Sequence, residues 1–303
     1  MTKRLFIFIC ISMLSWQATA QLDSSATRYK KRQQWVNAGL YASYGGTMAM
    51  LYNFWYKDYP LEGFHFFDDN AEWLQMDKVG HMGSAYQVGL LGIELYRWTG
   101  KDEKKAIWYG GSLGSVFLTS IEILDGFSSE WGASWGDLLA NTSGTALVIS
   151  QELLWKEQRV RVKYSFSSTP LNSIRPNTLG SNLGETMFKD YNGQTYWLSA
   201  NIKSILLKDD GKFPEWLNLA VGYGANGMLG GRNNVFEKEG IFYDYSHVSR
   251  YRQWYISPDI DWSKIKTKSK TLRKVFYLLN TVKIPAPAMQ FNKKGVQFHY
   301  LHF

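Results

Sequence analysis

Cysteine is nearly absent from this chain of 303 residues, which contains only Cys10. Cys10 lies in an apolar stretch near the N-terminus and is preceded by Ile7, Phe8 and Ile9, so the chain lacks the lipobox of a lipoprotein. If that stretch is removed on export, the mature chain excludes disulfide bonds, thiolate catalysis and cysteine-bound zinc. The sequence also lacks a nucleophile elbow, a zinc-protease helix and a nucleotide fingerprint, so no specific enzyme class is indicated.

The first 20 residues have the organisation of a secretory signal peptide. Lys3 and Arg4 precede an apolar run over residues 5–16, and residues 18–20 (Ala-Thr-Ala) form a small-x-small cleavage site. The apolar run is too short to span a bilayer. We therefore expect a signal peptide over residues 1–20 and an exported protein, in the periplasm or outer membrane of a double-membrane envelope. An uncleaved N-terminal anchor is the alternative.

Basic charge is concentrated in the second half of the chain. Residues 1–157 carry 13 Lys and Arg against 16 Asp and Glu, whereas residues 158–303 carry 21 against 10. On an exported protein, a basic half indicates an anionic surface such as lipid headgroups or envelope glycan, unless it serves solubility alone. Nucleic acid is not expected as a partner. Aromatic residues make up 16% of the chain, which suits a membrane interface or an aromatic-rich core.

Four apolar stretches within residues 35–157 predict a helical bundle. They cover residues 36–56, 79–98, 106–121 and 138–154. Their many glycine and serine residues permit close contact between helices. The first stretch has 21 residues without a charge and is long enough to span a bilayer, but four basic residues precede it, against the positive-inside tendency. We expect a bundle that lies in or against a membrane from the outer side.

Six polar residues with helical spacing stand at the ends of these stretches. They are Asp77, His81, Glu122, Asp125, Asp137 and Asn141. They form three pairs: Asp77 with His81 and Asp137 with Asn141, each four positions apart, and Glu122 with Asp125, three apart. Each pair therefore shares one helix face. Ser134 is placed to cap the helix that follows, with Asp137 as its third residue. If the three helices pack together, four carboxylates, one imidazole and one amide converge.

Two chemistries and one structural role fit this cluster. The metal candidates are Asp77, His81, Glu122 and Asp125, because oxygen-rich ligands with one histidine hold magnesium, manganese, iron or zinc. Alternatively, a buried carboxylate beside His81 could act as general acid–base. In the structural role, a hydrogen-bonded and ion-paired network that includes Lys78 fixes the helix register without any reaction. The sequence identifies no cofactor-binding residues, and it leaves the cofactor open, with a divalent metal ion as the candidate.

These residues also carry a resemblance to a known family. Their order resembles that of the YfiM-like family of predicted periplasmic proteins of unknown function and, more distantly, of VanZ-like membrane proteins, over roughly residues 35–157. The matching positions are Asp77, Lys78, His81, Glu122, Asp125, Gly126, Gly132, Ser134, Asp137, Leu138, Asn141 and Gly144. The resemblance implies an envelope location and a helical core, and no reaction. The chain departs from the pattern by its missing lipobox and its long basic extension.

The extension, residues 158–303, is predicted to be rich in β-strands, which makes the fold class α+β. Residues 191–194 (Tyr-Asn-Gly-Gln) predict a hairpin turn. The candidate strands are residues 195–207, 216–229, 252–262, 274–284 and 295–303. The last strand ends on Phe303 and resembles the closing strand of outer-membrane barrels, although Gln297 and His299 share the face of Phe303. Membrane-embedded strands and a soluble sheet packed on the bundle both remain open.

Two classes of function follow. The first is an exported, membrane-associated structural or binding protein whose bundle encloses the polar cluster. The second is a metal-dependent hydrolase or transferase that acts on envelope lipids or glycans. The absence of enzyme motifs favours the first class.

Overall fold

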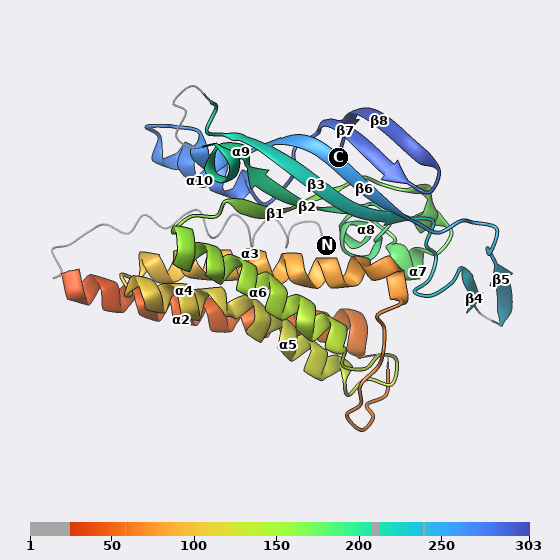
Figure 1. Ribbon diagram of the computed structural model, residues 1–303. Coiled ribbons are helices and arrows are strands. Elements are labelled where there is room, and N and C mark those ends of the chain that lie inside the picture. The colour runs from red at the N-terminus through yellow and green to blue at the C-terminus, as the bar shows by residue number, and fades with distance from the viewer. Residues whose placement is uncertain (1–24, 58, 208–212, 239) are drawn as a thin grey trace.

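The computed structural model describes residues 25–303, apart from residues 58, 208–212 and 239 (Figure 1). The predicted signal peptide and Cys10 therefore lie outside the described residues. The described chain is α+β, as expected: the N-terminal half forms a helical bundle and the C-terminal half a curved sheet. The two lie as layers, with α3 the bundle helix that faces the sheet (Figure 1).

The bundle follows the predicted helices closely. Its elements are α2 (Ser25–Leu51), η1 (Tyr52–Tyr56), η2 (Glu72–Gln75), α3 (Met76–Trp98), α4 (Glu103–Gly111), α5 (Leu113–Asp125) and α6 (Trp135–Trp155). All four predicted helices are confirmed, and the third is divided at Ser112 into α4 and α5. The principal core cluster consists of Tyr86, Leu90, Ile93, Ile107, Val148, Ile149 and Val162.

Glycines allow α3 to approach its neighbours with backbone in direct contact. A Cβ atom at Gly114 of α5 would lie 2.2 Å from the Ala85 carbonyl oxygen of α3, and one at Gly144 of α6 would lie 2.1 Å from that of Met82. Side chains at these positions cannot be accommodated at such distances. The small residues of the sequence therefore mark the helix contacts, as predicted for α3, α5 and α6.

The C-terminal half forms one six-stranded antiparallel sheet and one separate hairpin. The sheet has the order β1-β2-β3-β6-β7-β8, and β4 pairs with β5. The strands are β1 (Val160–Phe166), β2 (Gln194–Asn201), β3 (Leu217–Asn226), β4 (Val235–Lys238), β5 (Ile241–Asp244), β6 (Tyr251–Ile260), β7 (Ala286–Asn292) and β8 (Gly295–His302). Short helices connect them: η3 (Pro170–Ser173), α7 (Pro176–Leu179), α8 (Leu183–Lys189), α9 (Ile202–Leu206), η4 (Trp262–Lys264) and α10 (Lys270–Leu279).

Two predictions for the extension are wrong. Residues 270–279 form the helix α10, whereas residues 274–284 were predicted as a strand; Ser269 caps the helix, since its Oγ accepts a hydrogen bond from Leu272 N (3.2 Å). Its apolar residues recur at helical spacing with basic residues between them. Over a few residues, this pattern is easily taken for the alternation of a strand. The turn at residues 191–193 does not join two strands in a tight hairpin, because it follows helix α8.

The predicted strand over residues 195–207 is also shorter than expected. It ends at Asn201, whose Oδ1 accepts a hydrogen bond from Ser204 N (2.9 Å) and caps α9. The predicted strands over residues 216–229, 252–262 and 295–303 are confirmed as β3, β6 and β8.

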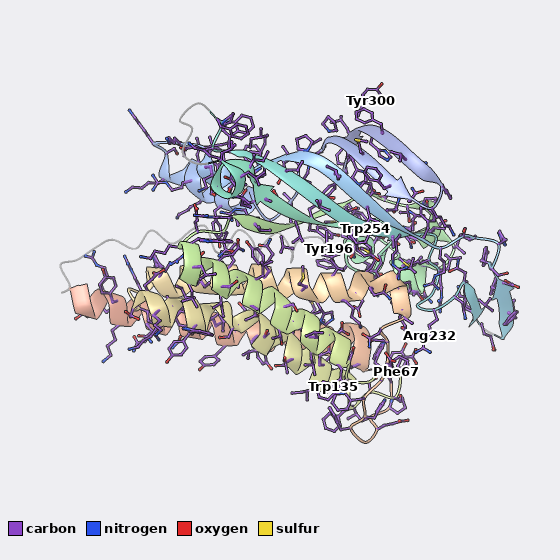
Figure 2. All side chains as sticks on the ribbon, viewed as in Figure 1. Phe67, Trp135, Tyr196, Arg232, Trp254 and Tyr300 are labelled. Atoms are coloured by element: carbon purple, nitrogen blue, oxygen red, sulfur yellow. The ribbon has the colours of Figure 1, made fainter. Side chains whose placement is uncertain are left out.

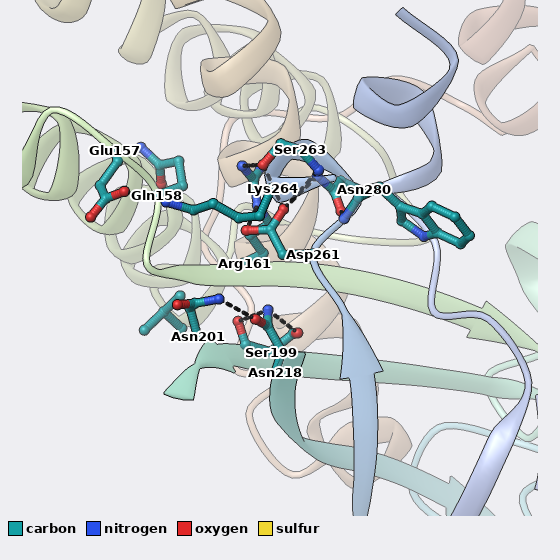
Figure 3. A network of polar contacts seen from close by, with 12 residues as sticks. Glu157, Gln158, Arg161, Ser199, Asn201, Asn218, Asp261, Ser263, Lys264 and Asn280 are labelled. Carbon is teal, nitrogen blue, oxygen red and sulfur yellow. Dashed lines mark hydrogen bonds and ion pairs between the residues drawn. The ribbon is translucent and has the colours of Figure 1, made fainter. Parts of the chain in front are cut away.

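The two faces of the sheet differ in polarity. Tyr196 and Val162 face α3, where a Cβ atom at Gly83 would lie 3.3 Å from Tyr196. The opposite face holds buried charges, among them Lys163, whose Nζ lies 2.7 Å from Asp259 Oδ2. Figure 3 shows how this polar network continues across the strands, through pairs such as Arg161–Asp261 and Asn201–Asn218. Alternation along the strands therefore places Val162 and Tyr196 toward the bundle, whereas the opposite face buries these polar residues together with an apolar cluster (Trp197, Ala220, Tyr255 and Ala288).

Candidate functional site

The six predicted site residues lie at the end of the bundle where α5 ends and where α3 and α6 begin. Asp77 and His81 belong to the first turns of α3, and Asp137 and Asn141 to those of α6. Glu122 lies in the last turn of α5. Glu122, Asp137 and Asn141 are buried, whereas the side chains of Asp77 and His81 are partly accessible.

The loop between α5 and α6 fixes two of the carboxylates. Ser134 Oγ accepts a hydrogen bond from Asp137 N (3.2 Å), which confirms the predicted helix cap. In a capping box, the side chain of Asp137 would accept a hydrogen bond from the backbone N–H of Ser134. Here that N–H donates instead to Glu122 Oε2 (2.9 Å). The Asp137 carboxylate is therefore free to contact α3.

Lys78 is the cation at the centre of the cluster. Its Nζ lies 2.6 Å from Asp69 Oδ2, 2.8 Å from Asp137 Oδ2 and 3.2 Å from Asp77 Oδ2. Burial opposes the charge of Lys78, but the neighbouring carboxylates outweigh it and raise the pKa of the ammonium group. Lys78 thus stays charged and holds one oxygen from each of three carboxylates.

His81 lies on the other side of the same carboxylates. Its Nδ1 is 3.0 Å from Asn141 Oδ1, and because that oxygen can only accept, Nδ1 must donate. Its Nε2 lies 3.7 Å from Asp77 Oδ1, and its Nδ1 lies 3.7 Å from Glu122 Oε1. Burial opposes the imidazolium, but Asp77 and Asp137 outweigh it and raise the pKa of His81.

The pKa values of the carboxyl groups in the cluster are shifted in opposite directions: that of Asp77 is lowered, and those of Glu122 and Asp137 are raised. Burial raises the pKa of Glu122 to about 8 and, together with the charge of Asp77, that of Asp137 to about 7. Burial also disfavours ionised Asp77, but His81 and Lys78 outweigh it and lower the pKa of Asp77. Such a range of proton affinities in one cluster is typical of functional sites and also occurs in structural networks.

Asp125 lies beside the cluster rather than inside it. Its Oδ1 accepts a hydrogen bond of 2.5 Å from the hydroxyl of Tyr56, and burial raises the pKa of its carboxyl group to about 6. One ligand atom each of Asp77, His81 and Asp137 lies within 4.8 Å of the others. Asp125 is not a member of that group, so its role as a metal ligand stays a prediction.

Three residues of the site were not among the predicted ones. Asp69 comes from the polar connector before α3, and Tyr56 from the turn that ends the first helix. Tyr191 comes from the C-terminal half, and its hydroxyl donates a hydrogen bond to Asp77 Oδ1 (2.9 Å). The run Asp68-Asp69-Asn70 was a visible signal in the sequence, whereas nothing near Tyr191 indicates a contact with α3.

The C-terminal half also positions the entry to α3. The residues Trp73 to Gln75 have left-handed φ values of 46° to 63°, which are strained for residues with side chains. Trp73 N donates to Gly231 O (2.7 Å), and the hydroxyl of Tyr223 donates to Leu74 O. The turn that aims Asp77 into the cluster is therefore held by the sheet and its loops, so both halves of the chain build the site.

Three buried polar atoms of the cluster have no hydrogen-bond partner among the described residues. They are Glu122 Oε1, Asp137 Oδ1 and Asn141 Nδ2. Buried polar atoms are almost always paired, and an unpaired one costs about 1–3 kcal/mol. These three orphan atoms are therefore candidates for contact with a bound water, ion or ligand.

The segment that contains this cluster is similar to a family of exported proteins. A family described as "Predicted periplasmic lipoprotein (DUF2279)" matches residues 62–152, a segment that contains all six predicted site residues. The match agrees with an exported protein of unknown function, located in the periplasm or at the outer membrane. The narrower likeness to YfiM-like and VanZ-like proteins stays a prediction. No curated protein and no solved structure matches the chain.

Proposed function

We propose that the chain is a membrane-associated binding protein of the cell envelope. In this proposal, the side of the bundle that faces away from the sheet lies on a lipid surface, and the polar cluster is the binding site within. The observation that carries it is the outer side of α5 and α6, which is apolar, exposed and without charge over its length.

Charge is almost missing from the surface of this region. Residues 106–155, all described by the structure, carry five charged side chains, of which only Glu130, in a loop, is exposed. In contrast, Leu154 is 73% exposed, Leu139 69% and Val116 61%. Monomeric soluble proteins rarely expose so large an apolar area unless it contacts a partner or a membrane.

The two ends of the bundle have the composition of membrane-interface borders. Exposed basic residues gather at one end, where Arg97 of α3 contacts Glu152 of α6: they are Arg28, Lys30, Lys104, Lys105 and Lys156. Aromatic residues gather at the other end, among them Phe67 and Trp135 (Figure 2). Basic residues attract anionic headgroups and aromatic rings prefer the interface, so both ends support a lipid partner.

The arrangement favours a bundle that lies on the membrane. One helical segment in the described part of the chain, Glu103–Asp125, is long and apolar enough to cross a membrane, and only 33% of its most apolar window is buried. The sheet, however, covers the opposite side of the bundle along α3 (Figure 1). An apolar face on the side of the bundle away from the sheet suits insertion into one leaflet.

Flotation with lipid vesicles tests the proposal. We expect the purified mature protein to float with phosphatidylethanolamine/phosphatidylglycerol vesicles, and the double variant V116K/L139K to float at least tenfold less, because charges on a lipid-facing surface are costly. The matched control is L183K, which adds one charge at an equally exposed leucine of α8. Failure of the wild type to float, or equal flotation of all three proteins, would overturn the proposal.

A second candidate is the hydrolase or transferase acting on envelope lipids or glycans. The observation that favours it is the pair of buried carboxyl groups of Glu122 and Asp137, which hold protons near neutral pH beside His81. The variant E122Q separates the two candidates, because it keeps the hydrogen bond from Ser134 N but cannot transfer a proton. A folded E122Q protein that retains its cellular function would contradict the enzyme candidate.

A further inference from the structure

We infer that the polar cluster binds one divalent transition-metal ion, Zn²⁺ or Mn²⁺, with Asp77, His81 and Asp137 as protein ligands. The inference goes beyond the proposed membrane contact and does not depend on it. It rests on the positions of the ligand atoms, on the contacts that orient them and on the orphan atoms beside them.

The ligand atoms are close enough to share an ion. One atom each of Asp77, His81 and Asp137 lies within 4.8 Å of the others, and His81 Nε2 is 3.7 Å from Asp77 Oδ1. Two ligands at bonds of about 2.0–2.1 Å stand about 3.3 Å apart in tetrahedral geometry. Small side-chain rotations therefore suffice to form the site.

Neighbouring groups orient each ligand. Asn141 Oδ1 accepts the Nδ1 proton of His81, which leaves Nε2 as the atom that faces Asp77. This arrangement of histidine and hydrogen-bond acceptor is the one found behind metal-bound imidazoles. Lys78 contacts Oδ2 of both Asp77 and Asp137, so Oδ1 of each carboxylate faces away from the lysine; Oδ1 of Asp77 is oriented by the hydrogen bond from Tyr191.

The orphan atoms give independent support. Asp137 Oδ1 and Glu122 Oε1 belong to side chains that are 3% and 2% exposed, and neither has a hydrogen-bond partner among the described residues. A bound cation would contact Asp137 Oδ1 directly, whereas Glu122 Oε1 lies on the Nδ1 side of His81, at 3.7 Å. Without a cation, Asp137 Oδ1 is buried with no hydrogen-bond partner among the described residues.

Ligand type selects the kind of ion. Five carboxyl groups (Asp69, Asp77, Glu122, Asp125 and Asp137) lie in and beside the cluster, around the ammonium group of Lys78. Such oxygen ligands favour a divalent cation, which binds as the ligands release their protons. One imidazole among carboxylates suits Zn²⁺ or Mn²⁺, and the absence of thiolate ligands disfavours ions that prefer sulfur.

Metal binding by the full mature chain tests the inference. The protein is stripped with chelator and titrated with ZnCl₂ or MnCl₂ by calorimetry, and its metal content is then measured by elemental analysis. We expect about one ion per chain in the wild type. The variant H81A should lose the ion, whereas H65A, which removes a histidine outside the cluster, should keep it.

A second variant covers the case in which H81A fails to fold. D77N preserves the acceptor for the hydroxyl of Tyr191 but weakens a ligand, and we expect at least tenfold weaker binding. Absence of saturable binding by the wild type, or unchanged binding by folded H81A or D77N, would overturn the inference. Vesicle flotation is measured on the same proteins, so a failed metal site and a failed membrane contact are distinguishable.

Discussion

The ammonium group of Lys78 and the carboxylate of Asp137, which are 59 positions apart in the chain, meet with 2.8 Å between Nζ and Oδ2. Their contact joins the first turn of α3 to the first turn of α6. The same ammonium group lies 2.6 Å from Asp69, so it also fastens the connector that precedes α3. Lys78 therefore fixes the mutual register of three segments that carry the candidate site.

Loss of this cation should destabilise the fold strongly. In the variant K78M, three partly or fully buried carboxylates lose their partner, and we expect the free energy of unfolding to fall by about 3–5 kcal/mol. Chemical denaturation in chelator measures this change. The control K266M removes a lysine that is 87% exposed and paired with Glu215, and it should change stability by less than about 1 kcal/mol. Equal effects of the two variants would contradict the role of Lys78.

Glycine substitutions test the backbone contact between helices. In G144A, the new methyl group would lie 2.1 Å from Met82 O, so α6 must move away from α3, and we expect a loss of about 2 kcal/mol or more. The control G45A adds a methyl group to α2, where nothing lies within 4 Å, and should raise stability by about 0.5–1 kcal/mol. Thermal unfolding compares them. A G144A protein as stable as G45A would show that the helices do not approach so closely.

The buried ion pair on the polar face of the sheet should be sensitive to removal of one partner. Lys163 and Asp259 are both fully buried at 2.7 Å, and burial lowers the pKa of Lys163. The variant K163M leaves Asp259 with the hydrogen bond from Ser199 and the more distant cation of Lys283 (3.9 Å), and we expect a loss of about 3–5 kcal/mol. The double variant K163M/D259L removes both charges of the pair but leaves the buried Lys283 without its carboxylate, so it should recover part of the loss. Urea denaturation measures the free energy of unfolding of both variants. If the double variant is no more stable than K163M, the unpaired buried charge is not the cause of the loss.

Acid should weaken the fold through His302. Burial, with smaller contributions from His299 and Lys283, lowers the pKa of His302 to about 4, against 6.5 for the free side chain. Between these values the unfolded chain binds a proton that the folded chain does not, so this contribution to stability is lost as the pH falls from about 6.5 to about 4. We expect the free energy of unfolding of H302Q to fall less over this window than that of the wild type. Parallel pH dependence of the two proteins would refute the assignment.

The sequence predicts the bundle and most of the site, because the relevant signals are local. Asp77 and His81 are four residues apart, and Ser134 stands at a helix start, so helical spacing alone places them. Tyr191 could not be predicted, because its contact with Asp77 spans 114 positions and depends on how the sheet packs on α3. Helix α10 was missed because its amphipathic period competes with the β-propensity of Val275, Phe276 and Tyr277.

The membrane contact is the central claim, and one fluorescence measurement tests it most directly. Residues 21–303 contain no cysteine, so L139C in a protein made from these residues can be labelled selectively with an environment-sensitive dye, with K266C as the exposed control. On addition of phosphatidylethanolamine/phosphatidylglycerol vesicles, the account predicts a blue shift and a brighter signal at position 139 and no change at position 266. An unchanged signal at position 139, or equal changes at both positions, would contradict it.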